Sequence, residues 1–313
     1  MTSCWVVTEG IAGTENQCLG VARALGIIPK VKRISLNQPW KLLSPLIGFE
    51  SRASFSGDLL DPPYPEIILA SGRKAIAASR YIKKQSKGKT FCVFIQDPRV
   101  NPNQFDLVCV PSHDPTRGEN VIITDAAPNK ITKDRLADAY KEFDSALNHL
   151  PSKRVAVLIG GSSKAYNMSI EITKRLCSQL ISLADDGYGL MITASRRTGD
   201  ENQALLKEKL SHKNIYYWDG TGSNPYFGFL AHAQYILVTA DSTSMISESA
   251  STGKPVYVID LEGGSERIKK MHSNLISKGV LRNFEGALED YQYTPLNDAK
   301  LIADEIRKRL KLA

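Results

Sequence analysis

Short apolar runs alternate with amphipathic segments along most of this chain. Tyr235–Thr239 is a β-branched apolar run, which is typical of a buried parallel strand, and Val256–Ile259 is a second such run. Between them, Met245–Ser251 predicts a short helix that Gly253 ends. Residues 235–260 therefore predict a strand, a loop, a helix and a strand.

The same alternation continues on both sides of this stretch. In the first half it predicts strands at Trp5–Thr8, Val31–Leu36, Glu66–Ala70, Phe91–Gln96, Leu107–Val110 and Val121–Thr124, and helices at Glu15–Leu25, Lys74–Lys84 and Asp134–Leu147. In the second half it predicts strands at Val155–Ile159, Gly189–Thr193 and Ile215–Trp218, and helices at Ser169–Ala184, Glu201–Leu210, Asn224–Ala231 and Pro295–Leu312.

This order of elements predicts an α/β fold class. Each half begins with a strand, a glycine-bearing loop and a helix, and such alternation forms a parallel sheet covered by helices. We therefore expect two doubly wound, Rossmann-like domains that face each other across a cleft. Pro151-Ser152-Lys153 is the expected linker, so the domains span residues 1–150 and 151–313. The last helix is expected to pack back on the first domain.

One segment, Pro39–Phe55, does not fit the alternation. It predicts an amphipathic segment that Pro45 breaks, and its apolar positions are Trp40, Leu42, Leu43, Leu46, Ile47 and Phe49.

Composition narrows the class of protein. An apolar fraction of 42% and a charged fraction of 23% are typical of a globular protein, and no apolar run is long enough to span a membrane. The N-terminus has no basic region before its first apolar run, which argues against a signal peptide. The five cysteines are scattered, which favours buried free thiols in a reducing compartment. We expect a cytoplasmic protein.

The net charge of +7 has several interpretations. Solvated helix faces account for most such excess charge, but attraction to an anionic substrate or to an anionic membrane surface fits as well. Attraction to an anionic membrane surface predicts that the protein contacts a membrane peripherally. Nucleic acid is not an expected partner, since no basic stripe is interleaved with aromatic residues.

Candidate chemistry gathers at strand ends in the second half. Gly160-Gly161-Ser162-Ser163 follows a predicted strand and precedes a helix, so its backbone could approach a phosphate, and a tight β–α turn is the equal alternative. Asp241-Ser242-Thr243-Ser244 is the corresponding loop of the opening stretch. Because both loops lie at the carboxyl ends of parallel strands, they are expected to face one ligand.

Two further features belong to this predicted site. Ser195 and Arg196 end another strand, and the Arg196-Arg197 pair suits a diphosphate, although a solvated arginine pair is the alternative. Glu248 lies one turn into the helix, where it could accept hydrogen bonds from ribose hydroxyls or simply interact with the helix dipole.

The first half offers candidates for the acceptor side. Glu9 and Glu15 flank the loop that contains Gly10 and Gly13, and either carboxylate could be a general base or a helix cap. Other strand-end residues of this half could bind an anion, line the cleft or transfer a proton; they are Ser71, Gly72, Arg73, Gln96, Asp97, His113 and Asp114. For His113, a lone surface histidine is the alternative.

Other site classes find no support in the sequence. The chain has no GxSxG nucleophile elbow and no Cys/His cluster for zinc, so we expect no metal and no cofactor.

With these residues in view, the chain resembles the family of the plant mitochondrial-fission, or elongated-mitochondria, protein and its bacterial relatives. The resemblance covers almost the whole length. The residues that carry it are Trp5–Gly10 with Gly13, Gln17–Gly20, Ser71–Arg73, Gln96–Arg99, Phe105–Asp114, Gly160–Ser162 and Asp241–Pro255.

The resemblance implies a GT-B-like fold and a donor-nucleotide site similar to that of the N-acetylglucosaminyltransferase of peptidoglycan synthesis. In this chain the Gly160 loop would then contact phosphate and Glu248 the ribose. The first loop has no histidine where that enzyme carries one, which leaves Glu15 as the candidate catalytic residue.

These expectations support three functions. The first is a metal-independent glycosyltransferase that uses a nucleotide-sugar donor and an unknown acceptor in cell-envelope or polysaccharide synthesis. The second is a non-catalytic adaptor or scaffold, which the plant relative implies. The third is an epimerase or hydrolase that acts on the same nucleotide-sugar.

Overall fold

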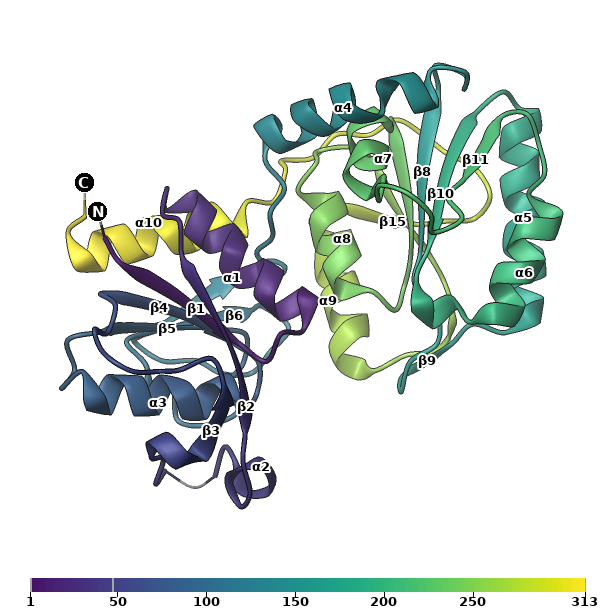
Figure 1. Ribbon diagram of the computed structural model, residues 1–313. Helices are drawn as coiled ribbons and strands as arrows, with labels where there is room; N and C mark the ends of the chain where they lie inside the picture. Colours follow the sequence, from purple (N-terminus) through teal and green to yellow (C-terminus); the bar gives the residue numbers. More distant parts are fainter. Residues whose placement is uncertain (1, 47, 313) are drawn as a thin grey trace. The chain divides into compact units, whose positions relative to one another are not determined.

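The computed structural model describes residues 2–46 and 48–312, and these fold into two compact units (Figure 1). Unit 1 contains Met1–Lys130 and Asn297–Ala313, and unit 2 contains Ile131–Leu296. Each unit is built around its own parallel sheet, which confirms the α/β class and the expectation of two doubly wound domains.

The division between the units differs from the one expected at residue 150. Helix α4 (Lys133–Leu147) lies in unit 2, where it packs on α7 (Tyr226–His232). The absence of a side chain at Gly228 explains this packing, because a Cβ there would lie 2.6 Å from the Phe143 ring. The stacked rings of Tyr140 and His232, 3.9 Å apart, extend the contact.

Unit 1 contains a seven-stranded sheet in the order β3-β2-β1-β4-β5-β6-β7. Its strands are β1 (Cys4–Thr8), β2 (Lys30–Leu36), β3 (Phe55–Gly57), β4 (Ile67–Ser71), β5 (Phe91–Ile95), β6 (Leu107–Pro111) and β7 (Val121–Thr124). All neighbouring strands are parallel except β3, which pairs antiparallel with β2. The central strands are apolar on both faces, as parallel strands covered by helices must be.

Helices cover both faces of this sheet (Figure 1). Helix α1 (Ala12–Ala24) and the C-terminal helix α10 (Asp298–Leu310) share one apolar cluster with Val6 and Leu69. Helix α3 (Ala75–Gln85) shares the opposite cluster with Val7 and Ile68. Helix α2 (Trp40–Leu43) is short and has no buried residue. Because α10 shares the apolar cluster of α1 and this sheet, the last helix of the chain belongs to unit 1.

Unit 2 contains a six-stranded sheet, in which all pairings are parallel, in the order β11-β10-β8-β12-β13-β15. Its strands are β8 (Arg154–Ile159), β10 (Gly189–Ala194), β11 (Ile215–Tyr217), β12 (Tyr235–Thr239), β13 (Val256–Ile259) and β15 (Leu281–Asn283). Two short strands, β9 (Tyr166–Asn167) and β14 (Glu262–Gly263), form a separate antiparallel pair.

Figure 1 shows α5 (Ile170–Asp185) and α6 (Asp200–Lys209) on one side of this sheet. Helices α4, α7 and α8 (Thr243–Ala250) lie on the other side. Neither α9 (Glu266–Ser277) nor β15 was predicted from the sequence. The signal for α9 was present, because Ser265 caps the helix and Ile268, Met271 and Leu275 recur at helical spacing, whereas β15 is only three residues long.

Two further expectations can be compared with the fold. All five cysteines are buried and free, as expected, and burial raises the pKa of the Cys92 thiol to about 12. None of the helices within residues 2–46 and 48–312 is both long and apolar enough to cross a membrane.

Candidate functional site

The loops that follow β8 and β12 meet at the carboxyl edge of the unit 2 sheet. The backbone N–H of Gly160, directly after β8, donates to Thr239 Oγ1 at the end of β12 (2.7 Å). A Cβ added to Gly160 would lie 2.3 Å from Asp241 Oδ1, so this close approach requires glycine. The two predicted ligand loops are thus neighbours within one unit, as a shared ligand would require.

The loop that follows β10 joins them. Ser195 Oγ and Thr198 Oγ1 both donate to the Gly160 carbonyl, at 2.7 Å and 2.6 Å. A Cβ on Gly161, where φ is +141°, would lie 2.2 Å from the Arg197 carbonyl oxygen. Larger residues therefore cannot replace either glycine unless the loops move apart.

Asp241 lies buried at the centre of these loops and is paired on both oxygens. Its Oδ1 accepts from Thr239 Oγ1 (2.7 Å), and its Oδ2 accepts from Arg197 Nη2 (2.5 Å). The carboxylate side chain is 0% exposed, whereas that of Arg197 is 48% exposed. Because the ion pair compensates its charge, Asp241 holds the loops together and does not present an unpaired negative charge to a ligand.

Two cations at this edge stay available for an anionic ligand. Arg196, beside Arg197, and Lys164, at the end of the glycine loop, are both exposed. Within the described chain neither has an ion-pair partner. The two arginines therefore differ, since Arg197 is committed to Asp241 and Arg196 is not.

The start of α8 adds backbone donors. Ser242 is its N-cap residue, and Ser242 Oγ accepts from the Met245 N–H (3.4 Å). The first backbone bond of the helix runs from the Ile246 N–H to the Ser242 carbonyl (3.0 Å). The N–H groups of Thr243 and Ser244 therefore have no acceptor within the helix, and such groups favour an anion.

Glu248 lies one turn into α8 and is half-buried. Tyr226, at the start of α7, donates its hydroxyl to Glu248 Oε2 (2.5 Å). Burial raises the pKa of Tyr226 well above its usual value, and the Glu248 carboxylate raises it further. Tyr226 is therefore protonated at neutral pH and orients the carboxylate.

The hydroxyls of Ser162 and Ser163 stabilise their own loop. Ser162 Oγ accepts from the Met168 N–H (3.0 Å), and Ser163 Oγ accepts from the Tyr166 N–H (3.2 Å). The chain then enters β9, and α5 begins only at Ile170. A short strand therefore separates the loop from the helix, and the loop can offer a phosphate its own backbone N–H groups but not those of the start of α5.

In unit 1, the helix start after Ser71-Gly72-Arg73 holds a carboxylate of the chain itself. Glu9 Oε1 accepts from the Lys74 N–H (2.8 Å), and Glu9 Oε2 lies 3.0 Å from Lys74 Nζ. Gly72, with φ at +97°, passes beside this carboxylate. Arg73 instead donates to a backbone carbonyl, that of residue 44. The anion that we expected from outside is thus supplied by Glu9.

The candidate base Glu15 is bound by an arginine. Its two oxygens accept from Arg33 Nε (2.8 Å) and Arg33 Nη2 (2.7 Å). The hydrogen bond from Arg33 lowers the pKa of Glu15, which makes it a weaker base. Helix α1 begins at Ala12, so Gly13 lies in its first turn and not in a loop, whereas Gly10 (φ +78°) turns the chain after β1.

Gln96 and Asp97 follow β5 at the same edge. Gln96 has φ at +98°, a left-handed conformation that is uncommon outside glycine. Asp97 Oδ1 accepts from the Arg99 N–H (2.8 Å) and from Thr116 Oγ1 (2.7 Å), so it braces this loop.

His113 is buried and is not the surface histidine of the alternative interpretation. Its Nε2 lies 4.0 Å from Asp114 Oδ2, which is too long for the direct hydrogen bond of a proton-transfer pair.

Several polar residues that connect the strand-end loops were not predicted from the sequence. Thr239 ends a predicted strand and Thr198 follows an arginine pair, but only their contacts with Gly160 show their role. In the sequence, Tyr226 is recognisable only as a residue near the start of a predicted helix, and nothing there indicates a contact with Glu248. Gln17 could have been noticed, because it falls on the buried side of an amphipathic helix.

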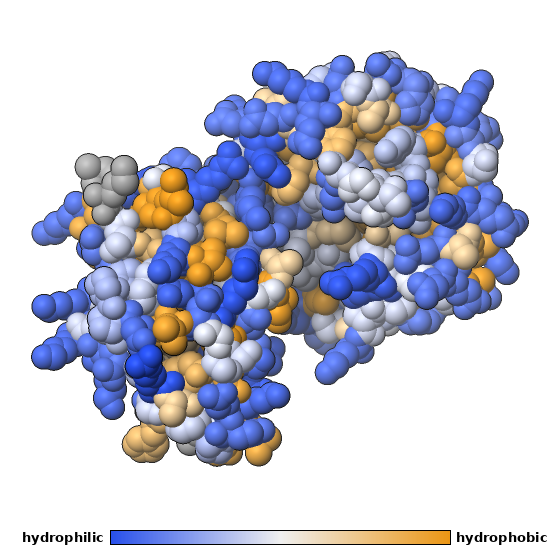
Figure 2. Space-filling model, in the orientation of Figure 1, coloured by the Kyte–Doolittle hydropathy of each residue, from blue (hydrophilic) through white to orange (hydrophobic). Residues whose placement is uncertain are grey.

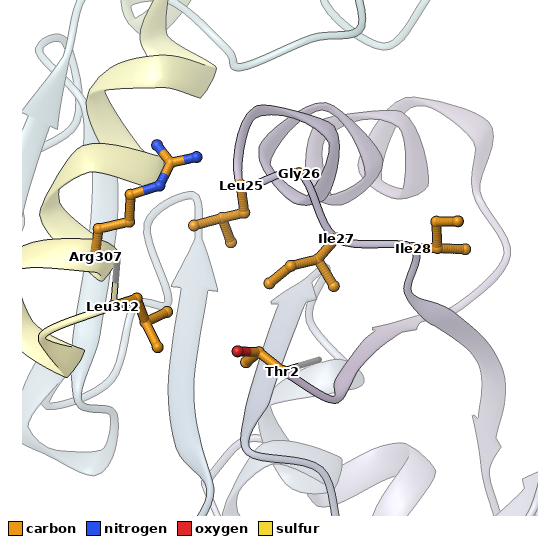
Figure 3. A pocket seen from close by; sticks show the side chains of 7 residues that line it. All are labelled: Thr2, Leu25, Gly26, Ile27, Ile28, Arg307 and Leu312. Carbon is orange, nitrogen blue, oxygen red and sulfur yellow. The ribbon is translucent and has the colours of Figure 1, made fainter.

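Figure 3 shows a cavity in unit 1. It has a volume of about 350 Å³ and lies between the end of α1 and the end of α10. Leu25, Ile27 and Leu312 point into it, and Arg307 borders it (Figure 3). Because Thr2 precedes β1 and Ile28 precedes β2, the cavity lies at the amino ends of these strands, whereas the predicted site residues of unit 1 follow the carboxyl ends of its strands. No group of three or more His, Cys, Asp and Glu side chains in the described chain is placed to hold a metal ion.

Comparison with known sequences identifies relatives of the whole chain. The family model described as Mitochondrial fission ELM1 matches residues 12–310. Mitochondrial fission protein ELM1 of Arabidopsis thaliana is 27% identical over 387 residues, which cover 97% of this chain and 90% of the plant protein. Uncharacterized protein RP120 of Rickettsia prowazekii (strain Madrid E) is 26% identical over 355 residues, which cover 98% of both.

Solved structures share the fold at low sequence identity. UDP-GlcNAc 2-epimerase from Methanocaldococcus jannaschii has a TM-score of 0.60 at 12% identity, with 100% of both chains covered. S. aureus MnaA, solved with UDP, has a TM-score of 0.53 at 13% identity and covers 99% of this chain and 98% of its own. MurG of Acinetobacter baumannii has a TM-score of 0.51 at 12% identity, and the match covers 99% of this chain and 91% of MurG. The two parallel α/β sheets thus form a GT-B-like fold, and the chain belongs to the Mitochondrial fission ELM1 family.

Proposed function

We propose that this protein binds a nucleotide-sugar donor at the carboxyl edge of the unit 2 sheet and acts as a GT-B-type glycosyltransferase. The convergence of strand-end loops at Gly160 carries the proposal. There the glycine loop touches the β12–α8 loop at Asp241 and the β10 loop at Ser195. Crevices at the carboxyl ends of parallel strands are the usual ligand sites of such sheets.

In this proposal each group has a separate role. The amides of Thr243 and Ser244 and the side chain of Arg196 bind the diphosphate, and Lys164 adds a second positive charge. Glu248, oriented by the Tyr226 hydroxyl, accepts hydrogen bonds from the ribose.

The chemistry would consist of positioning the donor and stabilising charge on the leaving diphosphate. Backbone N–H groups and cations supply that stabilisation, so the proposal assigns no metal. It also leaves Glu15 out of proton transfer, because the Arg33 pair lowers the pKa of this carboxyl group. The acceptor would belong to cell-envelope or polysaccharide synthesis.

Structural neighbours support the choice of ligand. S. aureus MnaA is solved with UDP, and the M. jannaschii epimerase is also solved with UDP-GlcNAc and UDP. These neighbours make an epimerase or a hydrolase acting on the same donor the natural alternative. Analysis of the products separates the three activities, since only a transferase needs an acceptor.

Calorimetry with a panel of nucleoside diphosphates tests the donor site. We expect UDP to bind at millimolar concentration or below, and Glu248→Ala to weaken binding without unfolding the protein. Glu208→Ala, at an exposed glutamate near the C-terminal end of α6, serves as a matched control. The absence of binding by every diphosphate in the panel would refute the proposal.

A second function, a non-catalytic scaffold attached to a membrane surface, is favoured by one observation. The segment after β2 exposes large apolar side chains: Leu42 is 74% exposed, Leu46 86% and Phe49 83%. Figure 2 shows such side chains at the α2 end of unit 1. Ile47 of this predicted amphipathic segment lies outside the described residues. Such a patch on a globular protein usually marks an interaction site.

Hydrogen bonds hold this segment in place. Trp40 Nε1 donates to the Phe49 carbonyl (2.9 Å), and Arg80 Nη1 donates to the Pro45 carbonyl (2.8 Å). Arg80 is also paired with the buried carboxylate of Glu50. With the backbone held at Pro45 and Phe49, the exposed side chains of Leu46 and Phe49 could insert into a lipid surface at a low entropic cost.

Sedimentation with anionic phospholipid vesicles tests the scaffold function. We expect the wild type to co-sediment and the Leu46→Ser/Phe49→Ser variant to remain in solution. Ile28→Ser removes a side chain that is 98% exposed elsewhere on unit 1, and it should leave sedimentation unchanged. Equal sedimentation of all three proteins would exclude this segment as the attachment site. A Glu248→Ala protein that keeps its full cellular function would favour the scaffold over the enzyme.

A further inference from the structure

A second polar site lies at the carboxyl edge of the unit 1 sheet, between β1 and β4. Strand β1 connects to β2 through α1, whereas β4 connects to β5 through α3, and these helices pack on opposite faces of the sheet. The chain therefore leaves β1 and β4 in opposite directions. This is the topological switch point at which doubly wound sheets bind ligands.

Two glutamines meet at this switch point although they are far apart in the sequence. Gln17, on α1, accepts through Oε1 from Gln96 Nε2 (3.0 Å) and from Ser71 Oγ (3.4 Å). Gln17 is only 7% exposed. In the described chain neither Gln17 Nε2 nor Gln96 Oε1 has a hydrogen-bond partner, and neither is a fully buried atom. The pair thus offers one donor and one acceptor that reach solvent.

The backbone at Gln96 indicates that this arrangement is maintained at a cost. Its φ of +98° is strained for a residue with a Cβ, and glycine would adopt it more readily. Strain of this kind concentrates at ligand sites. A glutamine side chain at this position is therefore better explained by what it binds than by the turn that it makes.

The charges around the glutamines do not favour an anion. Glu9 and Glu15 flank the switch point from the β1 side, and the cations nearest to them are paired with them, Lys74 with Glu9 and Arg33 with Glu15. A carboxamide pair that offers both a donor and an acceptor matches a hydroxyl, which is itself both. Arg99, in the loop after Gln96, is exposed, so phosphate is the competing ligand that a test must include.

We propose that Gln17 and Gln96 form a subsite for an uncharged, hydroxyl-bearing ligand such as a sugar ring. This inference deepens the proposed function, on which it rests for one point only, namely that the ligand is the acceptor of the transfer. The acceptor is then recognised through neutral hydroxyls at unit 1, and the donor is recognised through its diphosphate at unit 2.

Ligand-observed NMR on the full chain tests the subsite, with glucose, N-acetylglucosamine and inorganic phosphate as probes at millimolar concentration. We expect the neutral sugars to bind the wild type. Gln17→Leu and Gln96→Gly should each lower that affinity about tenfold, the effect of losing one or two neutral hydrogen bonds. Gln85→Ala, on the exposed end of α3, is the matched control and should bind as the wild type does.

Gln96→Gly also separates binding from a structural role. Glycine accommodates the positive φ, so the thermal unfolding midpoint should equal or exceed that of the wild type while sugar binding falls. A lower midpoint together with unchanged sugar binding would show that Gln96 is only structural. The proposal is also overturned if no sugar binds the wild type, or if only phosphate binding depends on Gln96.

The same samples distinguish this inference from the proposed function. UDP binding at unit 2 should be unchanged in Gln17→Leu and Gln96→Gly. A wild type that binds sugar through Gln96 but binds no nucleotide refutes the donor site and leaves the subsite standing. A wild type that binds UDP but no sugar refutes the subsite and leaves the donor site standing.

Discussion

Replacing Gly160 by alanine probes the contact on which the donor site depends. The added Cβ would lie 2.3 Å from Asp241 Oδ1 and 2.4 Å from Oδ2, so the carboxylate must move by about 1 Å to reach ordinary van der Waals distance. A shift of that size breaks at least one of the bonds to Arg197 (2.5 Å) and Thr239 (2.7 Å). Overpacking and the loss of a charged hydrogen bond both indicate a destabilisation of about 2 kcal/mol.

Chemical denaturation measures this loss, and calorimetry with UDP measures its consequence. We expect Gly160→Ala to lower the free energy of unfolding and to weaken UDP binding, because the three strand-end loops no longer fit together. Gly118→Ala is the control: its φ is not positive and its Cβ would meet nothing nearer than 3.3 Å, a methyl group of the Val121 side chain, so stability should change by less than about 0.5 kcal/mol. If Gly160→Ala is as stable as the wild type and binds UDP equally well, the loops are not packed as described and the reasoning fails.

Three other changes test single groups. Arg196→Gln should weaken UDP binding about tenfold and leave thermal stability unchanged, because this exposed arginine has no ion-pair partner in the described chain; calorimetry and thermal melts decide. Tyr226→Phe removes the hydroxyl that orients Glu248, so UDP affinity should fall severalfold in calorimetry while circular dichroism stays that of the wild type. The Arg33 pair lowers the pKa of Glu15, so its stabilisation is present above the unfolded pKa of about 4.3 and is lost as pH falls through the lowered folded value. Denaturation of the wild type and Arg33→Gln should therefore differ at pH 7 and converge in acid; a difference that is constant with pH would contradict the assignment.

The sequence predicted the fold well where single segments carry their own signal. The apolar run Tyr235–Thr239 is β12 with the same bounds, and Val256–Ile259 is β13. A buried parallel strand must be apolar on both faces, so the requirement is visible in each strand without its neighbours.

The strands that were missed, β3, β9, β14 and β15, are only two or three residues long, which is too short for a periodic pattern. Helix α9 was overlooked although Ile268, Met271 and Leu275 recur at helical spacing, and helix α1 begins three residues before the predicted Glu15 because its first turn is weakly patterned. The sequence also identified the glycine loop and the β12–α8 loop as a pair, since parallel strands bring their carboxyl ends to one edge.

The partners of the charged and polar groups could not be read in this way. Arg197 binds Asp241 across 44 residues, and Glu9 binds the Lys74 N–H across 65. Gln17 meets Gln96 across 79 residues. Each pairing depends on which strands are adjacent and on the direction in which a loop leaves its strand, and neither is encoded in local periodicity. The sequence by itself determined which residues lie at strand ends, because burial imposes a pattern along the chain. Only the tertiary structure decided which of these residues neutralise one another and which stay open to a ligand, because a side chain pairs with whatever the packing of the sheet brings within hydrogen-bond distance.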